Sequence, residues 1–268
     1  MSALGRLQES RRALGAARHG EEAGGPATPL ARLDYTGALI VVEGIDGSGK
    51  STQIQMLRDY LQRQGADVVF TEWNSSTLTR AAVRRGKRRR WLGPLSFLLL
   101  HATDFAHRFE NVILPALRSG KIVLADRYVF TAFARDAARG ANRASLRSSY
   151  SFAVQPDLAL YFRVPLDVAL RRVLSGEGRD GLKYYEAGLD LGLSADPEES
   201  YALFQRRVVD EYERMVPEFD LRVIDADRAV EPQHLDVREL VTPILRRHLD
   251  LKQRTARLRP QWEVIRAS

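Results

Sequence analysis

Five short apolar runs recur along the chain, and longer stretches with helical periodicity separate them. The runs are residues 38–43, 67–71, 121–126, 158–164 and 221–226. Continuous apolar runs that alternate with helices are typical of parallel strands covered on both faces. The pattern therefore predicts an α/β fold with a five-stranded parallel sheet and helices on both sides.

Apolar residues spaced three and four apart predict the helices between these strands. The series after the first strand ends at Gly65. The other expected helices are residues 95–117, 197–215 and 230–249. Because proline removes a backbone donor, we expect Pro115 to cap or kink its helix, Pro217 to lie beyond the next, and Pro243 to interrupt the last.

The two ends differ from the patterned region. Residues 1–33 are dominated by Gly, Ala, Pro and charge, which predicts a flexible N-terminal extension. This segment has no apolar block typical of a secretion signal, and its acidic residues argue against an organelle transit peptide. Residues 34–250 are the expected domain, and residues 251–268 a basic C-terminal tail.

Composition narrows the class of protein. A chain of 268 residues with 44% hydrophobic residues can form one substantial domain. No window reaches the ~18 consecutive apolar residues of a membrane-spanning helix. The chain has no cysteine, which excludes disulfides and thiolate metal sites and fits a reducing compartment. We therefore expect a cytoplasmic protein without membrane contact.

The net charge of +7 favours polyanionic partners. Residues 80–91 hold seven basic residues and no acidic one. One interpretation is a solvated helix face and loop. The other is an anion-binding patch that contacts a polyanion through residues 80–90. The sequence leaves both open.

The segment "GIDGSGKS" after the first strand fits the phosphate-loop pattern G-x-x-x-x-G-K-[ST]. Its glycines let backbone N–H groups curve around phosphate oxygens, and the following helix adds positive charge at its N-terminus. Lys50 would reach the β- and γ-phosphates, and Ser51 would bind Mg²⁺. The residues expected to bind ATP are Gly44, Asp46, Gly47, Ser48, Gly49, Lys50, Ser51 and Thr52.

A second polar pair follows the third apolar run. Asp126 and Arg127 stand at the carboxyl end of that strand, where open parallel sheets place their ligands. Asp126 can hold Mg²⁺ through water, and Arg127 can contact transferring phosphates. The alternative interpretation is an ion pair on the surface.

With these motifs the chain resembles the thymidylate kinase family over residues 37–249. The similar segments are "IVVEGIDGSGKSTQIQMLRDYL", "ENVILPALRSGKIVLADRY", "PDLALYFRVPLDVALRRV" and "VIDADRAVEPQHLDV". The resemblance implies a P-loop kinase fold with sheet order 2-3-1-4-5. It also implies Mg²⁺-dependent phosphoryl transfer from ATP to a nucleoside monophosphate, with thymidine monophosphate as the leading acceptor and the diphosphate as product. Family members are commonly homodimers.

The resemblance also places a mobile basic lid at about residues 171–194. Its basic residues Arg171, Arg172, Arg179 and Lys183 are available to close over the phosphates. The expected catalytic residues are Lys50, Asp46, Arg127, Arg179 and Lys183. Asp46 would orient the acceptor, and no strong general base is needed because the protein mainly positions groups and stabilises charge.

The acceptor side departs from the family pattern. Glu72 and Trp73 stand where the family has a phosphate-binding arginine and its neighbour. Phe105 replaces a base-reading arginine, with Arg108 nearly one turn later. The expected substrate-binding residues are Glu72, Trp73, Phe105, Arg108, Arg127, Tyr128, Arg135 and Asp136. An arginine–phenylalanine exchange cannot keep the same hydrogen bonds, so we expect weak or relaxed use of thymidine monophosphate.

Two rival functions follow from these departures. One is a kinase for another nucleotide or a different small phosphate acceptor. The other is a nucleotide-dependent switch that grips a polyanion through residues 80–90. The intact set of Lys50, Ser51, Asp126 and Arg127 favours an enzyme.

Overall fold

The computed structural model describes residues 30–31, 33–175 and 182–258. All strand pairs of its single named sheet are parallel, and the order is β2-β3-β1-β4-β5. The strands are β1 (Ala38–Glu43), β2 (Val68–Glu72), β3 (Ile122–Asp126), β4 (Leu158–Arg163) and β5 (Arg222–Asp225). The predicted fold class and sheet order are confirmed.

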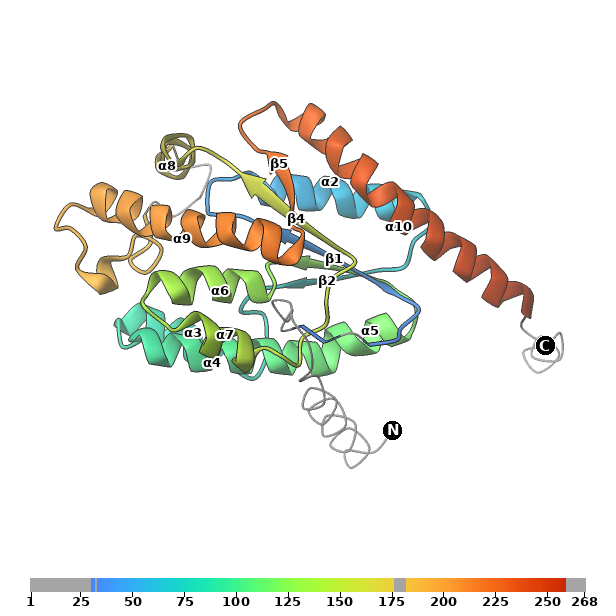
Figure 1. Cartoon of the computed structure of the whole chain (residues 1–268), viewed down its shortest axis with the longest axis horizontal. Helices are drawn as coiled ribbons and strands as arrows, with labels where there is room; N and C mark the ends of the chain where they lie inside the picture. The colour runs from blue at the N-terminus through green and yellow to red at the C-terminus, as the bar shows by residue number, and fades with distance from the viewer. Residues whose placement is uncertain (1–29, 32, 176–181, 259–268) are drawn as a thin grey trace.

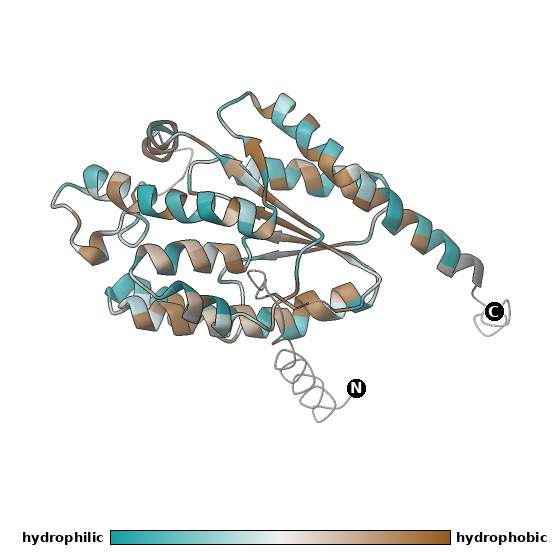
Figure 2. Ribbon diagram, in the orientation of Figure 1, coloured by the Kyte–Doolittle hydropathy of each residue, from teal (hydrophilic) through white to brown (hydrophobic). Residues whose placement is uncertain are grey.

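Helices cover both faces of this sheet (Figure 1). They are α2 (Lys50–Arg63), α3 (Arg80–Arg89), α4 (Pro94–Arg108), α5 (Leu114–Arg118), α6 (Val129–Ala138), α7 (Arg143–Ser149), α8 (Leu166–Leu174), α9 (Pro197–Phe219) and α10 (Val230–Leu258). Helices α2 and α10 lie on one side, and α4, α6 and α9 on the other (Figure 1). Figure 2 shows why this arrangement is stable: the strands are largely hydrophobic, while the helices carry polar residues outward.

The structure confirms only part of what the sequence predicted for the effect of three prolines on their helices. Leu114 begins α5 directly after a π-helical turn, Phe109–Ile113, and Pro115 is the second residue of α5, so one helical run continues from α4 with a local irregularity. Pro217, expected beyond its helix, lies inside α9, and Pro243 lies inside α10 without ending it. Proline costs about 3 kcal/mol in a helix interior, and burial of the flanking apolar residues against the core offsets that cost.

The N-terminal end of the described domain lies earlier than the predicted boundary at residue 34. Leu30 is buried, and Ala31 pairs with Val154 as an isolated parallel bridge. Within the described part of the chain, Leu30 and Ala31 therefore already contact the domain. At the other end, α10 extends to Leu258, into the segment predicted as a tail.

The sheet register brings the chemically important strand ends together. Val42 of β1 and Glu72 of β2 both align with Asp126 of β3. The loops that follow these strands therefore leave the sheet at one edge, which is where parallel sheets place ligands. Among the described residues, no helix combines the length and apolarity needed to cross a bilayer.

Candidate active site

The loop after β1 is shaped by glycines in left-handed conformations. Gly47 has φ 81° and Gly49 φ 79°. A Cβ at Gly47 would lie 2.5 Å from the carbonyl oxygen of Ala169, so glycine is required there. Helix α2 starts at Lys50 with Gly49 at its N-cap, and no side chain caps it. Its first backbone N–H groups are therefore available to an anion.

Lys50 lies inside this loop. Its side chain is buried, and Nζ donates a hydrogen bond to the carbonyl oxygen of Ile45 at 3.2 Å. Burial lowers the pKa of Lys50 to about 8, and Arg127 acts in the same direction, while Asp46 and Asp126 oppose it. An anion that binds beside Lys50 would therefore stabilise the charged ammonium, which burial disfavours.

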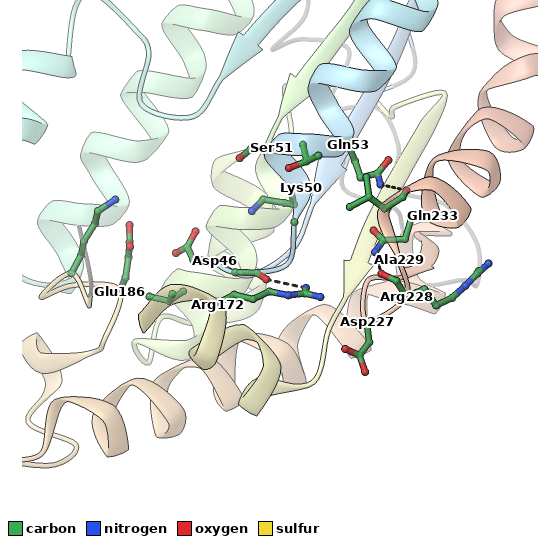
Figure 3. A pocket seen from close by; sticks show the side chains of 16 residues that line it. Asp46, Lys50, Ser51, Gln53, Arg172, Glu186, Asp227, Arg228, Ala229 and Gln233 are labelled. Carbon is green, nitrogen blue, oxygen red and sulfur yellow. Dashed lines mark hydrogen bonds between the residues drawn. The ribbon is translucent and has the colours of Figure 1, made fainter. Parts of the chain in front are cut away.

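A pocket of about 720 Å³ opens between the loop, the end of α8 and the segment after β5 (Figure 3). Of the residues predicted to bind ATP, it is lined by Asp46, Gly47, Gly49, Lys50, Ser51 and Thr52. Gly44 and Ser48 lie behind this surface and are buried. The opposite wall is formed by Asp227, Arg228, Ala229, Val230 and Gln233. One end of the pocket therefore lies at the phosphate loop, and the other end lies at the start of α10.

The basic residues of the predicted lid lie in different environments. Arg172 lines the pocket and donates to the carbonyl oxygens of Gly47 at 3.3 Å and Ala226 at 3.0 Å. Lys183 also lines the pocket. Arg171 instead pairs with Asp167 on the exposed surface. Arg179 falls outside the residues that the structure describes.

Asp46 joins two guanidinium groups at the mouth of the pocket. One oxygen accepts from Arg127 Nη2 at 2.5 Å and the other from Arg135 Nη2 at 2.6 Å. Burial favours the neutral acid, but Arg135, Arg127 and Lys50 together hold the pKa of Asp46 well below its usual range. The carboxylate thus stays charged and fixes both arginines toward the loop.

The backbone at Arg127 is strained. Its φ of 68° is unusual for a residue with a side chain. Two contacts hold the turn: the Arg127 N–H donates to Val42 at 2.9 Å, and Nη1 donates to the Gly44 carbonyl oxygen at 2.9 Å. The bonds to Gly44 and Asp46 direct the guanidinium toward the phosphate loop.

Glu43, the last residue of β1, is a fully buried acceptor that was not among the predicted site residues. It receives hydrogen bonds from the Tyr128 N–H at 2.7 Å, Thr131 Oγ1 at 2.6 Å and Tyr212 OH at 2.8 Å. Burial raises the pKa of Glu43, and these donors, with Arg127, act against that rise. Glu43 therefore ties β1 to α6 and α9 behind Arg127. The only sequence signal for it was its typical place before the loop.

Arg108, the last residue of α4, lies against the carboxyl-terminal half of β2. It is buried; Nε donates to Thr71 Oγ1 at 3.1 Å and Nη1 to Asp104 Oδ2 at 3.5 Å. Its Cζ is 5.8 Å from the centroid of the Trp73 ring. Nη2 is buried and has no hydrogen-bond partner. An unsatisfied buried donor is costly, so this group suits a ligand acceptor atom.

Asp104 supports Arg108 and was not predicted from the sequence. It accepts from the backbone N–H groups of Asn74 at 3.2 Å and Ser76 at 3.0 Å. It also accepts from Thr79 Oγ1 at 3.0 Å. These bonds fix the chain after β2 to α4. A buried acid among helical residues gave no sequence signal, because its partners are 25 to 30 residues away.

Two predicted substrate residues belong to the core instead. Phe105 is completely buried and packs edge-on against Tyr128 with ring centroids 5.0 Å apart. Tyr128 is also buried, and its hydroxyl donates to the carbonyl oxygen of Val154. Because both rings pack in the buried core, neither is placed for a direct polar contact with a ligand. Glu72 is exposed at the end of β2.

Asp136 is buried beside α4. Neither carboxylate oxygen has a hydrogen-bond partner, and Oδ1 lies 3.9 Å from His101 Nδ1. Burial raises the pKa of Asp136 to about 7, although Arg139 and Arg135 oppose the rise. Burial also lowers the pKa of His101 well below its ordinary value. Burial therefore favours the uncharged form of both groups.

The described residues contain no cluster of three or more His, Cys, Asp or Glu side chains that could hold a metal by themselves. Mg²⁺ commonly takes one or two protein oxygens and completes its shell with phosphates and water. Ser51 lines the pocket, and Asp126 has a buried Oδ1 without a partner at the end of β3. These residues fit such a partial site.

Comparison with known proteins identifies relatives of the whole domain. The family described as Thymidylate kinase matches residues 42–188. "Probable thymidylate kinase 2" of Saccharolobus solfataricus is 38% identical over 206 residues, covering 76% of this chain and 95% of that protein. "Probable thymidylate kinase" of Pyrococcus abyssi is 32% identical over 212 residues, covering 76% and 96%. "Thymidylate kinase" of Desulfotalea psychrophila is 37% identical over 149 residues, covering 54% and 72%.

Proposed function

The chain belongs to the thymidylate kinase family, and from this premise we propose that it transfers the γ-phosphoryl group of ATP to thymidine monophosphate, giving thymidine diphosphate and ADP. One observation carries the proposal. Lys50, Arg127 and Arg135 surround Asp46 between the phosphate loop and the side of the sheet that holds Arg108. A phosphoryl group that passes between two nucleotides needs positive charge at this midpoint.

On the donor side, ATP occupies the 720 Å³ pocket with its phosphates at residues 44–52. The base lies toward the segment Asp227–Val230 and Gln233. Ser51, and Asp126 through water, would hold Mg²⁺, which neutralises phosphate charge when bound.

During transfer, Lys50 and Arg127 stabilise the charge that spreads over the transferring phosphoryl oxygens. Arg172 and Lys183 close the charged shell from the lid side, and the proposed role of Arg179 stays a prediction from the sequence. Asp46 holds the arginines in place and orients the acceptor. Effective positioning of two bound reactants supplies much of the rate, so no strong base is required.

On the acceptor side, Arg108 takes the place of the arginine that Phe105 replaces. Its unpartnered Nη2 is a donor for a base carbonyl, and the neighbouring Trp73 ring offers an apolar face. The changes at Glu72, Phe105 and Asp136 are expected to lower the selectivity for thymidine monophosphate, whereas the donor on Arg108 is expected to raise it. The net effect can be measured as the ratio of kcat/KM between thymidine monophosphate and the other acceptors.

Initial rates of ADP formation test the function with thymidine, deoxyuridine, deoxycytidine, deoxyguanosine and deoxyadenosine monophosphates. We expect thymidine monophosphate to give the highest kcat/KM. Loss of one buried charged donor costs about 1–3 kcal/mol, so Arg108→Met should raise KM for this acceptor about 5- to 150-fold. Arg246→Met, on the exposed face of α10, is the matched control. Turnover of another acceptor in preference, or of none, contradicts the proposal.

We propose a second, separate binding role for the basic segment 80–90. It forms helix α3, and exposed Arg80, Arg84, Arg85 and Arg88 surround a hollow of about 390 Å³. Such a surface suits a polyanion. Fluorescence anisotropy with a labelled deoxythymidine 20-mer would test it, and equal affinity in an Arg84→Met/Arg88→Met variant would contradict it.

Two further expectations accompany the proposed activity. A homodimer, as in the family, is supported by Leu95 and Leu99, which are 70% and 56% exposed on the outer face of α4. Analytical ultracentrifugation would test it. A cytoplasmic location is proposed from the family and the absence of cysteine.

A further inference from the structure

Helix α3 turns one of its basic residues inward. Arg84, Arg85, Arg88 and Arg89 are exposed, whereas Lys87 is half-buried. Its Nζ lies 5.8 Å from the centroid of the Phe97 ring, which is itself almost completely buried. Lys87 therefore differs from the rest of this basic helix and faces the domain.

The direction of Lys87 is fixed by close packing at the end of α3. A Cβ at Gly86 would lie 2.6 Å from Leu92 Cδ2, so glycine lets the helix approach Leu92. Leu92 packs with Phe97 and Tyr185, and its N–H donates to the Tyr185 hydroxyl at 3.1 Å. The start of α4 and Tyr185, within the predicted lid, thus hold the end of α3 between them.

The surroundings of Lys87 connect it to the charged cluster of the site. Arg139 Cζ lies 5.1 Å from the centroid of the same Phe97 ring. Burial lowers the pKa of Lys87 to about 8, and Arg135 and Arg139 act in the same direction, while Glu186 and Asp46 oppose it. Within residues 30–31, 33–175 and 182–258, Lys87 forms no ion pair. Asp46 is engaged by Arg127 and Arg135 instead.

We propose that Lys87 binds the phosphate of the acceptor nucleotide. The segment after β2 has Glu72 and Trp73 where a phosphate-binding arginine was expected, so that segment supplies no cation. Lys87, on α3, lies beside the same Phe97 ring as Arg139, and Arg139 Nη1 donates to the carbonyl oxygen of Arg135 on α6 at 3.3 Å. Asp46 carries a single negative charge, which Arg127 and Arg135 already share. A dianionic monophosphate bound beside Lys87 and Arg135 would supply the additional negative charge that these cations need.

This inference rests on the proposed function, and its test measures the phosphate separately from the base. Dissociation constants for thymidine monophosphate and for thymidine are compared in the wild type, Lys87→Met, Lys87→Arg and Arg89→Met. ATP binding is measured in parallel. Arg89 is the matched control, because it lies on the same helix and has the same charge but is exposed.

We expect the wild type to bind thymidine monophosphate more tightly than thymidine. Lys87→Met should reduce that affinity ratio at least tenfold and raise KM for the monophosphate more than it lowers kcat. Lys87→Arg should restore part of the ratio. Thymidine and ATP affinities should stay within about twofold, and Arg89→Met should behave as the wild type.

The ratio of the two affinities does not depend on the fraction of folded protein, so partial misfolding of a variant leaves the test valid. An unchanged ratio in Lys87→Met overturns the role of Lys87. A wild type that does not distinguish the monophosphate from thymidine counts against the proposed acceptor and, with it, against this inference. An equal loss in Arg89→Met would show general attraction by the helix and also overturn it.

Discussion

Replacement of Asp46 by Asn removes the negative charge between two arginines while keeping the size of the side chain. In the wild type the carboxylate accepts one hydrogen bond from Arg127 and one from Arg135. Asn keeps one carbonyl acceptor and presents N–H groups to the other guanidinium. The two arginines, whose side chains are 12% and 13% exposed, are then left close together without their counter-charge.

The cost can be worked from these contacts. Hydrogen bonds to charged groups contribute about 1.5–3 kcal/mol each, and Asn retains one weaker bond. The Asp46 side chain is 26% exposed, so water reduces the loss. We expect Asp46→Asn to lower the free energy of unfolding by about 2–3 kcal/mol. For a domain of this size that is a fall in Tm of about 4–12 °C.

The effect should have a defined pH dependence. The arginines and Lys50 hold the pKa of Asp46 below its value of ~3.9 in the unfolded chain. The stabilisation is therefore fully present above about pH 4 and is lost as the pH falls through the lower, folded pKa. Urea unfolding of both proteins should give a constant difference from pH 5 to 8 that narrows below about pH 4.

A double-mutant cycle with Arg135→Met isolates the contact. Asp46→Asn should cost less in the Arg135→Met background, with a coupling of at least about 0.5 kcal/mol. A variant within 0.5 kcal/mol of the wild type at pH 7, together with no coupling, would refute the view that Asp46 organises the site.

Three further predictions concern neighbouring groups. Lys50→Met should lower kcat about 10²- to 10³-fold; because the pKa of Lys50 is lowered to about 8, the wild type should also gain stability relative to the variant between about pH 8 and pH 10 in urea melts. Asp136→Asn should gain stability relative to the wild type as the pH rises from about 4 to 7, since the pKa of the buried carboxyl is raised to about 7 and its ionisation then opposes folding; a constant difference over that range would contradict this. Glu43→Ala should destabilise by about 3 kcal/mol, because the Tyr128 N–H loses its buried acceptor, whereas Glu43→Gln keeps a carbonyl oxygen and should cost less in the same melts.

The sheet and the phosphate loop could be predicted from the sequence because both are encoded by local signals. The apolar runs give the strands, and Gly47 and Gly49 give a turn that few other residues can adopt. The prolines show the limit of local rules. Pro217 and Pro243 lie inside helices because packing against the core outweighs a local cost of about 3 kcal/mol.

The acceptor side was harder to predict because its contacts join distant segments. Phe105 was expected at the ligand, but its ring completes an aromatic core. Arg108 takes its direction from Thr71 and Asp104, which belong to different elements. Lys87 could not be separated from the other basic residues of its segment until the packing of Gly86 on Leu92 fixed which side of α3 faces inward.

The charges of the site explain why its geometry can exist before substrates arrive. Lys50, Arg127 and Arg135 would repel one another in a partly buried space, and the Asp46 carboxylate bonds two of them directly. Glu43 holds the backbone behind Arg127 without competing for the phosphates, because three donors already occupy it. Phosphates that bind beside Lys50 would add counter-charge that Asp46 does not supply. Ligands that bind the folded state alone raise its stability by RT ln(1 + [L]/Kd), so a site organised in this way should be stabilised far more by nucleotide phosphates than by nucleosides.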